Sequence, residues 1–382
     1  MTPLDPRPSR VFESPVGARV VVDGRSYLWF GGTAYLGLQS RPEVIAAASE
    51  AVQRYGVHPG SARSGYGTTP PLLAAEAELA EYFDSESALL TASGWSATGL
   101  LLAAEDTTTV RAFCDEHLHA SAREALLAER IPVHAFAHRD ADAARAAIAT
   151  HLGRGEAPWI ITDGVFAATG AIAPLGDYVT IAKEHPGSRV LVDDAHGFGV
   201  LGAGGAGSIG LHHGLDARHN ASPPSVDGAI RVAGTASKAL GGHGGVVTGP
   251  RAFVERIRAR SPWSAGSTPP SVANAAATAR AVRLAREEPQ LRERLAANLA
   301  ALRSRLDELG LTPPPTPAPI VALRFPEAEA TRLHEALADS RILVPKLCDY
   351  GGVRGCVLRI AVFATHEVAH FDELCTALRR FL

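Results

Sequence analysis

The sequence predicts an α/β protein built on a parallel sheet, and three features of the chain support this fold class. Between about residues 87 and 249, short apolar runs alternate with helical patterns, as in the βα units that build parallel sheets. Most of these runs end in a cluster of Gly, Asp, Ser or His. The chain has 382 residues and is 46% hydrophobic, so it is long enough for two or three structural units with substantial cores.

Six apolar runs are the predicted strands of the sheet. They span residues 88–91, 110–113, 159–162, 190–193, 230–233 and 245–248. The Gly-, His- and Pro-rich segment 202–228 is predicted to be a long surface loop between two of them. Ligands of open α/β sheets bind beyond the carboxyl ends of the strands, so the polar residues that follow these runs are the candidates for a functional site.

The C-terminal third predicts a second unit. Residues 271–309 have a long helical pattern that must end at the prolines 313–315. Strand, helix and strand patterns follow from residue 320, and an amphipathic helix is predicted at about 366–382. The predicted organisation is an N-terminal segment 1–40, a large domain 41–275 and a small α+β domain 276–382.

Composition excludes several classes of partner. With 37 basic and 40 acidic residues the formal net charge is −3, which predicts no broad surface for nucleic acid or anionic lipid. No stretch reaches the roughly 18 apolar residues that a membrane span needs, and residues 1–10 lack an apolar signal region. The four cysteines form no CxxC pair, so neither a metal site nor a disulfide framework is expected. These features predict a cytoplasmic protein with small-molecule partners.

The string Val-Leu-Val-Asp-Asp-Ala-His-Gly at 190–197 is the first candidate site, because a buried strand ends there in two carboxylates and a histidine. Asp193 could pair with a protonated ring nitrogen of a cofactor. At about 3 Å and an effective dielectric near 20, that attraction is on the order of 5 kcal/mol before desolvation. The alternative from this string alone is an aspartate that caps the next helix.

The string Gly-Thr-Ala-Ser-Lys-Ala-Leu-Gly-Gly at 234–242 is the second candidate site. Lysine occurs only at positions 183, 238 and 346, and Lys238 follows a predicted strand. An amine of lowered pKa there could form an imine with an aldehyde cofactor, while Thr235 and Ser237 could donate hydrogen bonds to its phosphate. The alternative, a phosphate-binding loop of a nucleotide enzyme, is disfavoured because the GxxxxGK[ST] pattern is absent.

Two further strings could complete this site. At residues 93–96 a glycine turn opens a helix, so the amides of Gly94 and Trp95 could bind a phosphate. At residues 117–121, His119 could stack on a cofactor ring, although a histidine in a loop is more often a structural hydrogen-bonding residue.

In this order along the chain, the strings resemble the α-oxoamine synthase family from about residue 26 to residue 382. The matching positions include Tyr35-Leu36-Gly37-Leu38, Ser64-Gly65-Tyr66-Gly67, Ser93-Gly94-Trp95, His119-Ala120-Ser121, Gly164-Val165-Phe166, Ala173-Pro174-Leu175, Asp193 to Gly197, Ser237-Lys238 and Arg359. The resemblance implies a pyridoxal 5'-phosphate (PLP) transferase of fold type I. Such a protein has a mostly parallel seven-stranded sheet flanked by helices and a smaller C-terminal domain.

The resemblance also implies a role for each matching residue. Lys238 would be the lysine that carries PLP, Asp193 would bind its pyridine nitrogen, His196 would lie near its phenolic oxygen and His119 would stack on its ring. Arg359 would hold the substrate carboxylate. Cofactor contacts are further expected from Asp163, Gly94, Trp95, Thr235, Ser237 and, from a second subunit, Ser267 or Thr268. The last two imply a homodimer with its active site at the subunit interface.

The reaction implied is the condensation of a small amino acid with an acyl-CoA thioester, with loss of carbon dioxide, to give an α-oxoamine. The chain departs from the family pattern at Ala167, where a hydroxyl is usual, and at Trp95 and Thr98. Another PLP reaction, such as transamination or a lyase step, is therefore the alternative. A non-catalytic binding protein is disfavoured because Lys238 and Asp193 are both retained.

Overall fold

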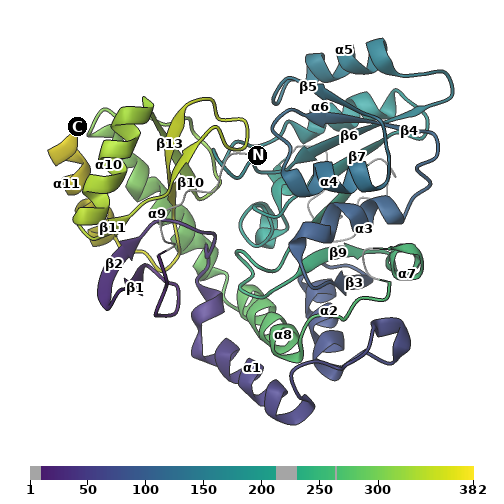
Figure 1. Cartoon of the computed structure of the whole chain (residues 1–382), viewed down its shortest axis with the longest axis horizontal. Coiled ribbons are helices and arrows are strands. Elements are labelled where there is room, and N and C mark those ends of the chain that lie inside the picture. Colours follow the sequence, from purple (N-terminus) through teal and green to yellow (C-terminus); the bar gives the residue numbers. More distant parts are fainter. Residues whose placement is uncertain (1–9, 212–229, 263–264) are drawn as a thin grey trace.

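The computed structural model describes residues 10–211, 230–262 and 265–382. The first nine residues of the predicted N-terminal segment 1–40 and most of the predicted loop 202–228 therefore lie outside the described residues. Figure 1 shows two lobes side by side, a larger one built on a central sheet and a smaller one that contains the C-terminus. Of the helices described, none is both long and apolar enough to cross a membrane.

The larger lobe contains the predicted sheet, and all six predicted runs are strands of it. Its seven strands have the order β3-β9-β8-β7-β6-β4-β5. Their bounds are Ser87–Leu90 for β3, Val110–Asp115 for β4, Val133–Phe136 for β5, Ala157–Asp163 for β6, Arg189–Asp193 for β7, Ile230–Thr235 for β8 and Gly245–Gly249 for β9. Only β9 runs antiparallel to its neighbours. The mostly parallel seven-stranded sheet is thus confirmed.

Helices cover both faces of this sheet because strand side chains alternate between the faces. Leu191 of β7 packs with α3 (Ala97–Ala103), α4 (Ala120–Ala128) and α7 (Arg251–Arg260). Its neighbours Val190 and Val192 pack on the opposite face with α5 (Ala141–His151) and α6 (Leu175–Lys183). The parallel strands are therefore buried on both faces, which leaves their carboxyl ends as the place where polar side chains gather.

The predicted long helix at 271–309 is two helices. Helix α8 (Val272–Glu287) packs against α1 (Pro42–Tyr55) and α2 (Pro70–Tyr82) of the larger lobe, and α9 (Gln290–Asp307) packs against α11 (Val368–Phe381) of the smaller lobe. Pro289 lies between α8 and α9, and its ring cannot continue a helix. No helix crosses the prolines 313–315, as expected.

The smaller lobe has two three-stranded sheets. Strands β10 (Ile320–Phe325), β12 (Lys346–Cys348) and β13 (Cys356–Ala361) form one antiparallel sheet with β13 in the centre. In the other, β1 (Arg19–Val22) and β2 (Arg25–Trp29) join β11 (Ile342–Leu343), next to α10 (Glu327–Asp339). The N-terminal strands thus pair with the C-terminal part of the chain. The predicted domain boundaries stay a prediction.

The expectation that the cysteines form no disulfide is wrong for one pair. Cys348 and Cys356 are bonded to each other, with their Cα atoms 4.1 Å apart. They lie directly opposite each other in the β12–β13 hairpin. The register of the hairpin brings the two cysteines together. No short cysteine motif in the sequence marks this pairing. Cys114 and Cys375 are buried and free.

Candidate active site

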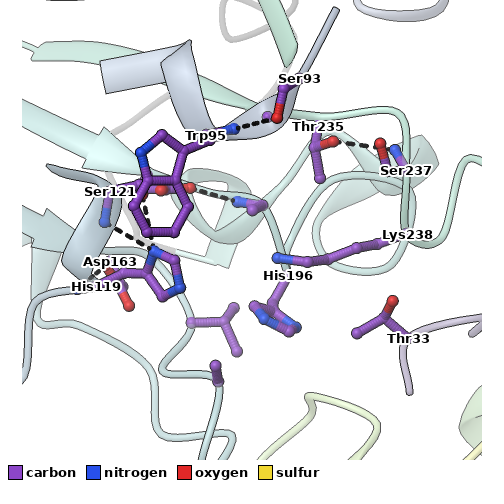
Figure 2. A pocket seen from close by; sticks show the side chains of 15 residues that line it. Thr33, Ser93, Trp95, His119, Ser121, Asp163, His196, Thr235, Ser237 and Lys238 are labelled. Carbon is purple, nitrogen blue, oxygen red and sulfur yellow. Dashed lines mark hydrogen bonds between the residues drawn. The ribbon is translucent and has the colours of Figure 1, made fainter. Parts of the chain in front are cut away.

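A cavity of about 370 Å³ lies beyond the carboxyl ends of β6, β7 and β8 (Figure 2). Nine of the predicted site residues line it together: Gly94, Trp95, His119, Asp163, Asp193, His196, Thr235, Ser237 and Lys238. Thr33, Ser93, Ser121, Val165, Ala167 and Ala195 complete its wall. The polar residues that follow the predicted strands are therefore brought together by the fold.

Two carboxylates face the cavity from neighbouring strands. Asp163 ends β6 and Asp193 ends β7, and the two residues pair directly across the ladder. Asp163 Oδ1 accepts a hydrogen bond from the His119 amide at 3.1 Å, and Asp193 Oδ1 accepts one from the Ala195 amide at 3.1 Å. Burial, and then the nearby Asp193 charge, raise the pKa of Asp163 well above its usual value. Such a pair of acids stabilises a positive charge placed beside it.

Lys238 places an amine near the carboxylates of Asp163 and Asp193. Figure 2 shows its side chain extending into the cavity, with its amino group next to His196. Burial lowers the pKa of Lys238, while the charges of Asp193 and Asp163 act in the opposite direction. The net lowering increases the fraction of neutral amine, which is the form that attacks a carbonyl carbon.

His196 is held by a buried chain of hydrogen bonds that reaches Arg359. Nδ1 of His196 lies 2.8 Å from the Tyr35 hydroxyl, and Arg359 Nη2 donates to the same hydroxyl at 3.3 Å. Burial raises the pKa of Tyr35, which keeps its proton, and lowers the pKa of His196 well below its usual value. Tyr35 therefore donates to Nδ1 of a neutral imidazole whose proton is on Nε2.

Arg359 is fixed beside the cavity by two more hydrogen bonds. Its Nε donates to the Ala167 carbonyl at 2.6 Å and its Nη1 donates to the Gly32 carbonyl at 3.1 Å. Only 7% of the residue is exposed. A buried guanidinium held by neutral acceptors keeps its full positive charge for an anionic ligand.

His119 lies at the start of α4, where its side chain caps the helix. Its Nδ1 lies 2.7 Å from Ser121 Oγ and accepts from the Ser121 amide at 3.3 Å. The Trp95 ring meets the His119 ring edge-on at 5.7 Å between centroids (Figure 2). The imidazole is thus both a helix cap and one side of the cavity, so the structural and functional interpretations of His119 hold together.

A small polar cradle lies between the turn at Gly94 and the loop after β8. A Cβ atom at Gly94 would come within 2.8 Å of Thr235 Oγ1, so any side chain at this position would crowd the cradle. Ser237 Oγ accepts from the Gly244 amide at 2.9 Å and keeps its own proton for a ligand. Thr235 differs, since its hydroxyl already donates to the Gly244 carbonyl at 2.7 Å.

Three predicted site residues do not line the cavity of the single chain: Arg359, which lies beside it, and Ser267 and Thr268. Ser267 and Thr268 are exposed. Their contact with the cofactor of a second subunit stays a prediction. Conversely, Tyr35 and Ser121 were part of the motifs but were assigned no role. The sequence does hold a signal for Tyr35, which is a polar aromatic residue in an apolar string. If such a residue is buried, its hydroxyl needs a hydrogen-bond partner.

The cavity fits PLP on these observations. It combines a half-buried amine, paired carboxylates for a protonated ring nitrogen, and a cradle with a free hydroxyl for a phosphate. The amide of Trp95 donates to Ser93 Oγ at 3.2 Å. The Ser93 side chain therefore lies next to the predicted phosphate site.

Comparison with known proteins agrees with this assignment. Residues 25–378 match the family model of aminotransferase class I and II. The putative 8-amino-7-oxononanoate synthase of Desulforudis audaxviator is 36% identical over 96% of this chain and 93% of that protein. The 8-amino-7-oxononanoate synthase of Symbiobacterium thermophilum is 32% identical over 98% of this chain and 93% of its own length.

Solved structures agree as well. A high-resolution structure of SPT with PLP superposes with a TM-score of 0.88, at 25% identity, over 98% of this chain and 92% of that one. The family match, the relatives and this shared fold lead to one conclusion: the chain belongs to the aminotransferase class I and II family and, within it, to the PLP-dependent α-oxoamine synthases.

Proposed function

We propose that this enzyme condenses a small amino acid with an acyl-CoA thioester, releases carbon dioxide and CoA, and yields an α-oxoamine. A relative that is 34% identical is named a biotin biosynthesis bifunctional protein, which supports a role in biotin biosynthesis. The observation that carries the proposal is the meeting of Lys238 with the Asp163–Asp193 pair in one cavity beside Arg359.

Different residues would bind different parts of the cofactor and of the amino acid substrate. Asp193 would hold the proton of the pyridine nitrogen, and Ser237 would donate to the phosphate. The Nε2–H of His196 would donate to the phenolic oxygen, because Tyr35 occupies Nδ1. His119 would cover one face of the ring. Arg359 would bind the carboxylate of the amino acid.

Bound PLP supplies a ring that withdraws electrons from the substrate amine and so weakens the bonds at its Cα. Lys238 would hold the cofactor at rest and then act as the general base that removes the Cα proton. Its pKa, lowered by burial, brings the amine closer to neutrality at working pH. Arg359 keeps the carboxylate away from bulk water until the new carbon–carbon bond has formed.

We also propose that the enzyme is a cytoplasmic homodimer in which Ser267 or Thr268 of each chain reaches the phosphate of the other. Sedimentation at low micromolar concentration tests the dimer. A cytoplasmic location would keep Cys348 and Cys356 largely reduced, since disulfides are rare there. Trapping of thiols in intact cells before lysis tests the location, because a protein found fully disulfide-bonded in the cell contradicts it.

The experiment that tests the reaction uses purified enzyme loaded with PLP. It is incubated with glycine, alanine or serine and with acyl-CoA thioesters, and free CoA and carbon dioxide are measured. Condensation predicts equal amounts of both products, formed only when amino acid and thioester are present together. Keto acid formation without thioester would instead indicate transamination, and would contradict the proposal.

A further inference from the structure

A second cavity adjoins the reaction cavity. It has a volume of about 300 Å³ and lies between the loop after β4, the start of α4 and the tip of the β12–β13 hairpin. His119, Asp163 and Ala167 line both cavities. The two spaces therefore meet at these three residues, next to the position of Lys238 and Arg359.

The hairpin tip forms a fitted outer wall of the second cavity. A Cβ atom at Gly352 would lie 1.7 Å from Cδ2 of the His117 ring, so the backbone of the tip rests directly on this histidine. Val353 and Val357 pack with Ala168 in a small apolar cluster. The antiparallel pairing of β12 with β13, in which Cys348 lies opposite Cys356, holds the base of the tip. The wall is thus anchored on both sides.

Ala167 lines both cavities, as His119 and Asp163 do. Its carbonyl accepts from Arg359 Nε at 2.6 Å, which fixes its backbone beside the group that would hold the amino acid. Its side chain is a single methyl group at the junction, where the family pattern carries a hydroxyl. A longer side chain at a residue that lines both cavities would take up space where they meet.

The second cavity is too large for the side chain of a small amino acid. Its volume equals about ten water molecules at roughly 30 Å³ each. Leu118 and Phe166 give it apolar walls, and both are buried. Arg123 also lines the cavity, and its Nε donates to the Leu118 carbonyl at 3.0 Å. Glu116 and Asp349 also line the cavity, so it is a mixed space that suits an extended chain better than a methyl group.

We propose that this second cavity receives the acyl chain of the thioester substrate, with Ala167 as the residue that admits it. This inference rests on the proposed condensation. The acyl carbon would lie at the junction, close to the Cα of the amino acid, and the chain would extend towards the hairpin tip. Chain-length preference is then set by the 116–120 loop, α4 and the tip.

Ala120→Leu tests the proposal from the far side of the junction. Ala120 is exposed at the start of α4 and lines only the second of the two cavities, so a leucine there reduces its volume. Ala128→Leu, an exposed position at the other end of α4, is the matched control. Each enzyme, loaded with PLP, is assayed with straight-chain acyl-CoA thioesters of increasing length and with a fixed amino acid.

Wild type is expected to use medium chains better than acetyl-CoA. Ala120→Leu should lower kcat/KM for medium chains by at least about tenfold, mainly through KM, and leave acetyl-CoA within about twofold. Ala128→Leu should match wild type at every length. A second variant, Ala167→Val, should lower kcat/KM more for medium chains than for acetyl-CoA, although acetyl-CoA activity should fall too because Ala167 also lines the reaction cavity.

Three results would overturn the inference: a loss that is equal for all chain lengths, no loss in either variant, or a loss that follows the size of the amino acid side chain. Failure of the condensation itself is a separate result, because wild-type enzyme with bound PLP would then release no CoA from any thioester. Absorbance of bound PLP confirms in each variant that the reaction cavity has formed.

Discussion

The hydroxyl of Tyr35 lies 2.8 Å from Nδ1 of His196 and also accepts a hydrogen bond from Arg359. This buried tyrosine connects the residue proposed for the cofactor's phenolic oxygen with the residue proposed for the substrate's carboxylate. It also fixes the tautomer of His196, whose Nε2 then carries the proton. A single hydroxyl from the N-terminal part of the chain therefore orients two functional groups.

Tyr35→Phe should lower kcat/KM for the amino acid by about 10- to 100-fold, because a buried hydrogen bond to a charged group is worth about 1.5–3 kcal/mol. The ring stays, so the thermal midpoint should change little. Tyr82→Phe removes a hydroxyl that donates to the Gly204 carbonyl at 2.8 Å and serves as the control. If both variants kept wild-type kinetics, the positioning role of Tyr35 would be wrong.

Asp193→Asn should lower kcat by roughly 150- to 5,000-fold, because loss of one partner from a buried ion pair costs about 3–5 kcal/mol and each 1.36 kcal/mol is about tenfold in rate. The affinity for PLP should fall as well, which titration of the apoenzyme followed by absorbance measures. Asp339→Asn changes an exposed aspartate at the end of α10 and should leave both quantities unchanged. Full activity of Asp193→Asn would rule out the proposed pairing with the ring nitrogen.

His366 should make folding stability depend on pH. The Phe363 amide donates to Nδ1 at 2.9 Å, so Nε2 carries the proton and donates to the Trp29 carbonyl at 3.0 Å. Burial lowers the pKa of His366 from 6.5 to about 4. A lowered pKa of a base means that stability is complete above pH 6.5 and is lost as the pH falls towards 4.

The loss due to His366 should be on the order of 3 kcal/mol, from about 1.4 kcal/mol per pKa unit. Thermal unfolding of wild type and of His366→Gln between pH 8 and pH 4 measures it. The variant should be less stable at neutral pH but show a flatter curve below pH 6.5, whereas His58→Gln at an exposed position should follow wild type. Parallel curves for wild type and His366→Gln would refute this account.

Reduction of the Cys348–Cys356 disulfide should lower stability on the order of 2 kcal/mol, because the cross-link closes only a short loop in the unfolded chain. Thermal unfolding with and without dithiothreitol measures the effect. Cys348→Ser should lower the midpoint in the absence of reductant and show no further change when reductant is added. If the thermal midpoint of wild type were the same with and without dithiothreitol, the disulfide would contribute nothing to folding stability.

The sheet was predictable because its central strands are continuous apolar runs between helical segments. Strand β5 was missed since it lies at the edge, where Val133 and Ala135 are exposed and His134 interrupts the apolar pattern. Lys238 and Asp193 were predictable because both follow buried strands. The disulfide and the contacts of Tyr35 depend on strand register and on packing between distant segments, which no local pattern encodes.

The same limit applies to the second cavity. Ala167 was recognised as a departure from the family pattern, but its place between two cavities depends on the β12–β13 hairpin, nearly 200 residues further along the chain. Ser267 and Thr268 depend on a second subunit in the same way. Contacts made between lobes or between chains are therefore the part of the site that the sequence alone does not determine.

Lys238 is proposed to carry PLP in a cavity where Asp163 and Asp193 keep the ring nitrogen protonated. Borohydride reduction of the PLP-loaded enzyme, followed by peptide mass spectrometry, tests it most directly. One PLP per chain is expected, attached to Nζ of Lys238, and none on Lys183 or Lys346. A label spread over other lysines, or Lys238→Ala enzyme that still consumes acyl-CoA at the wild-type rate, would contradict it.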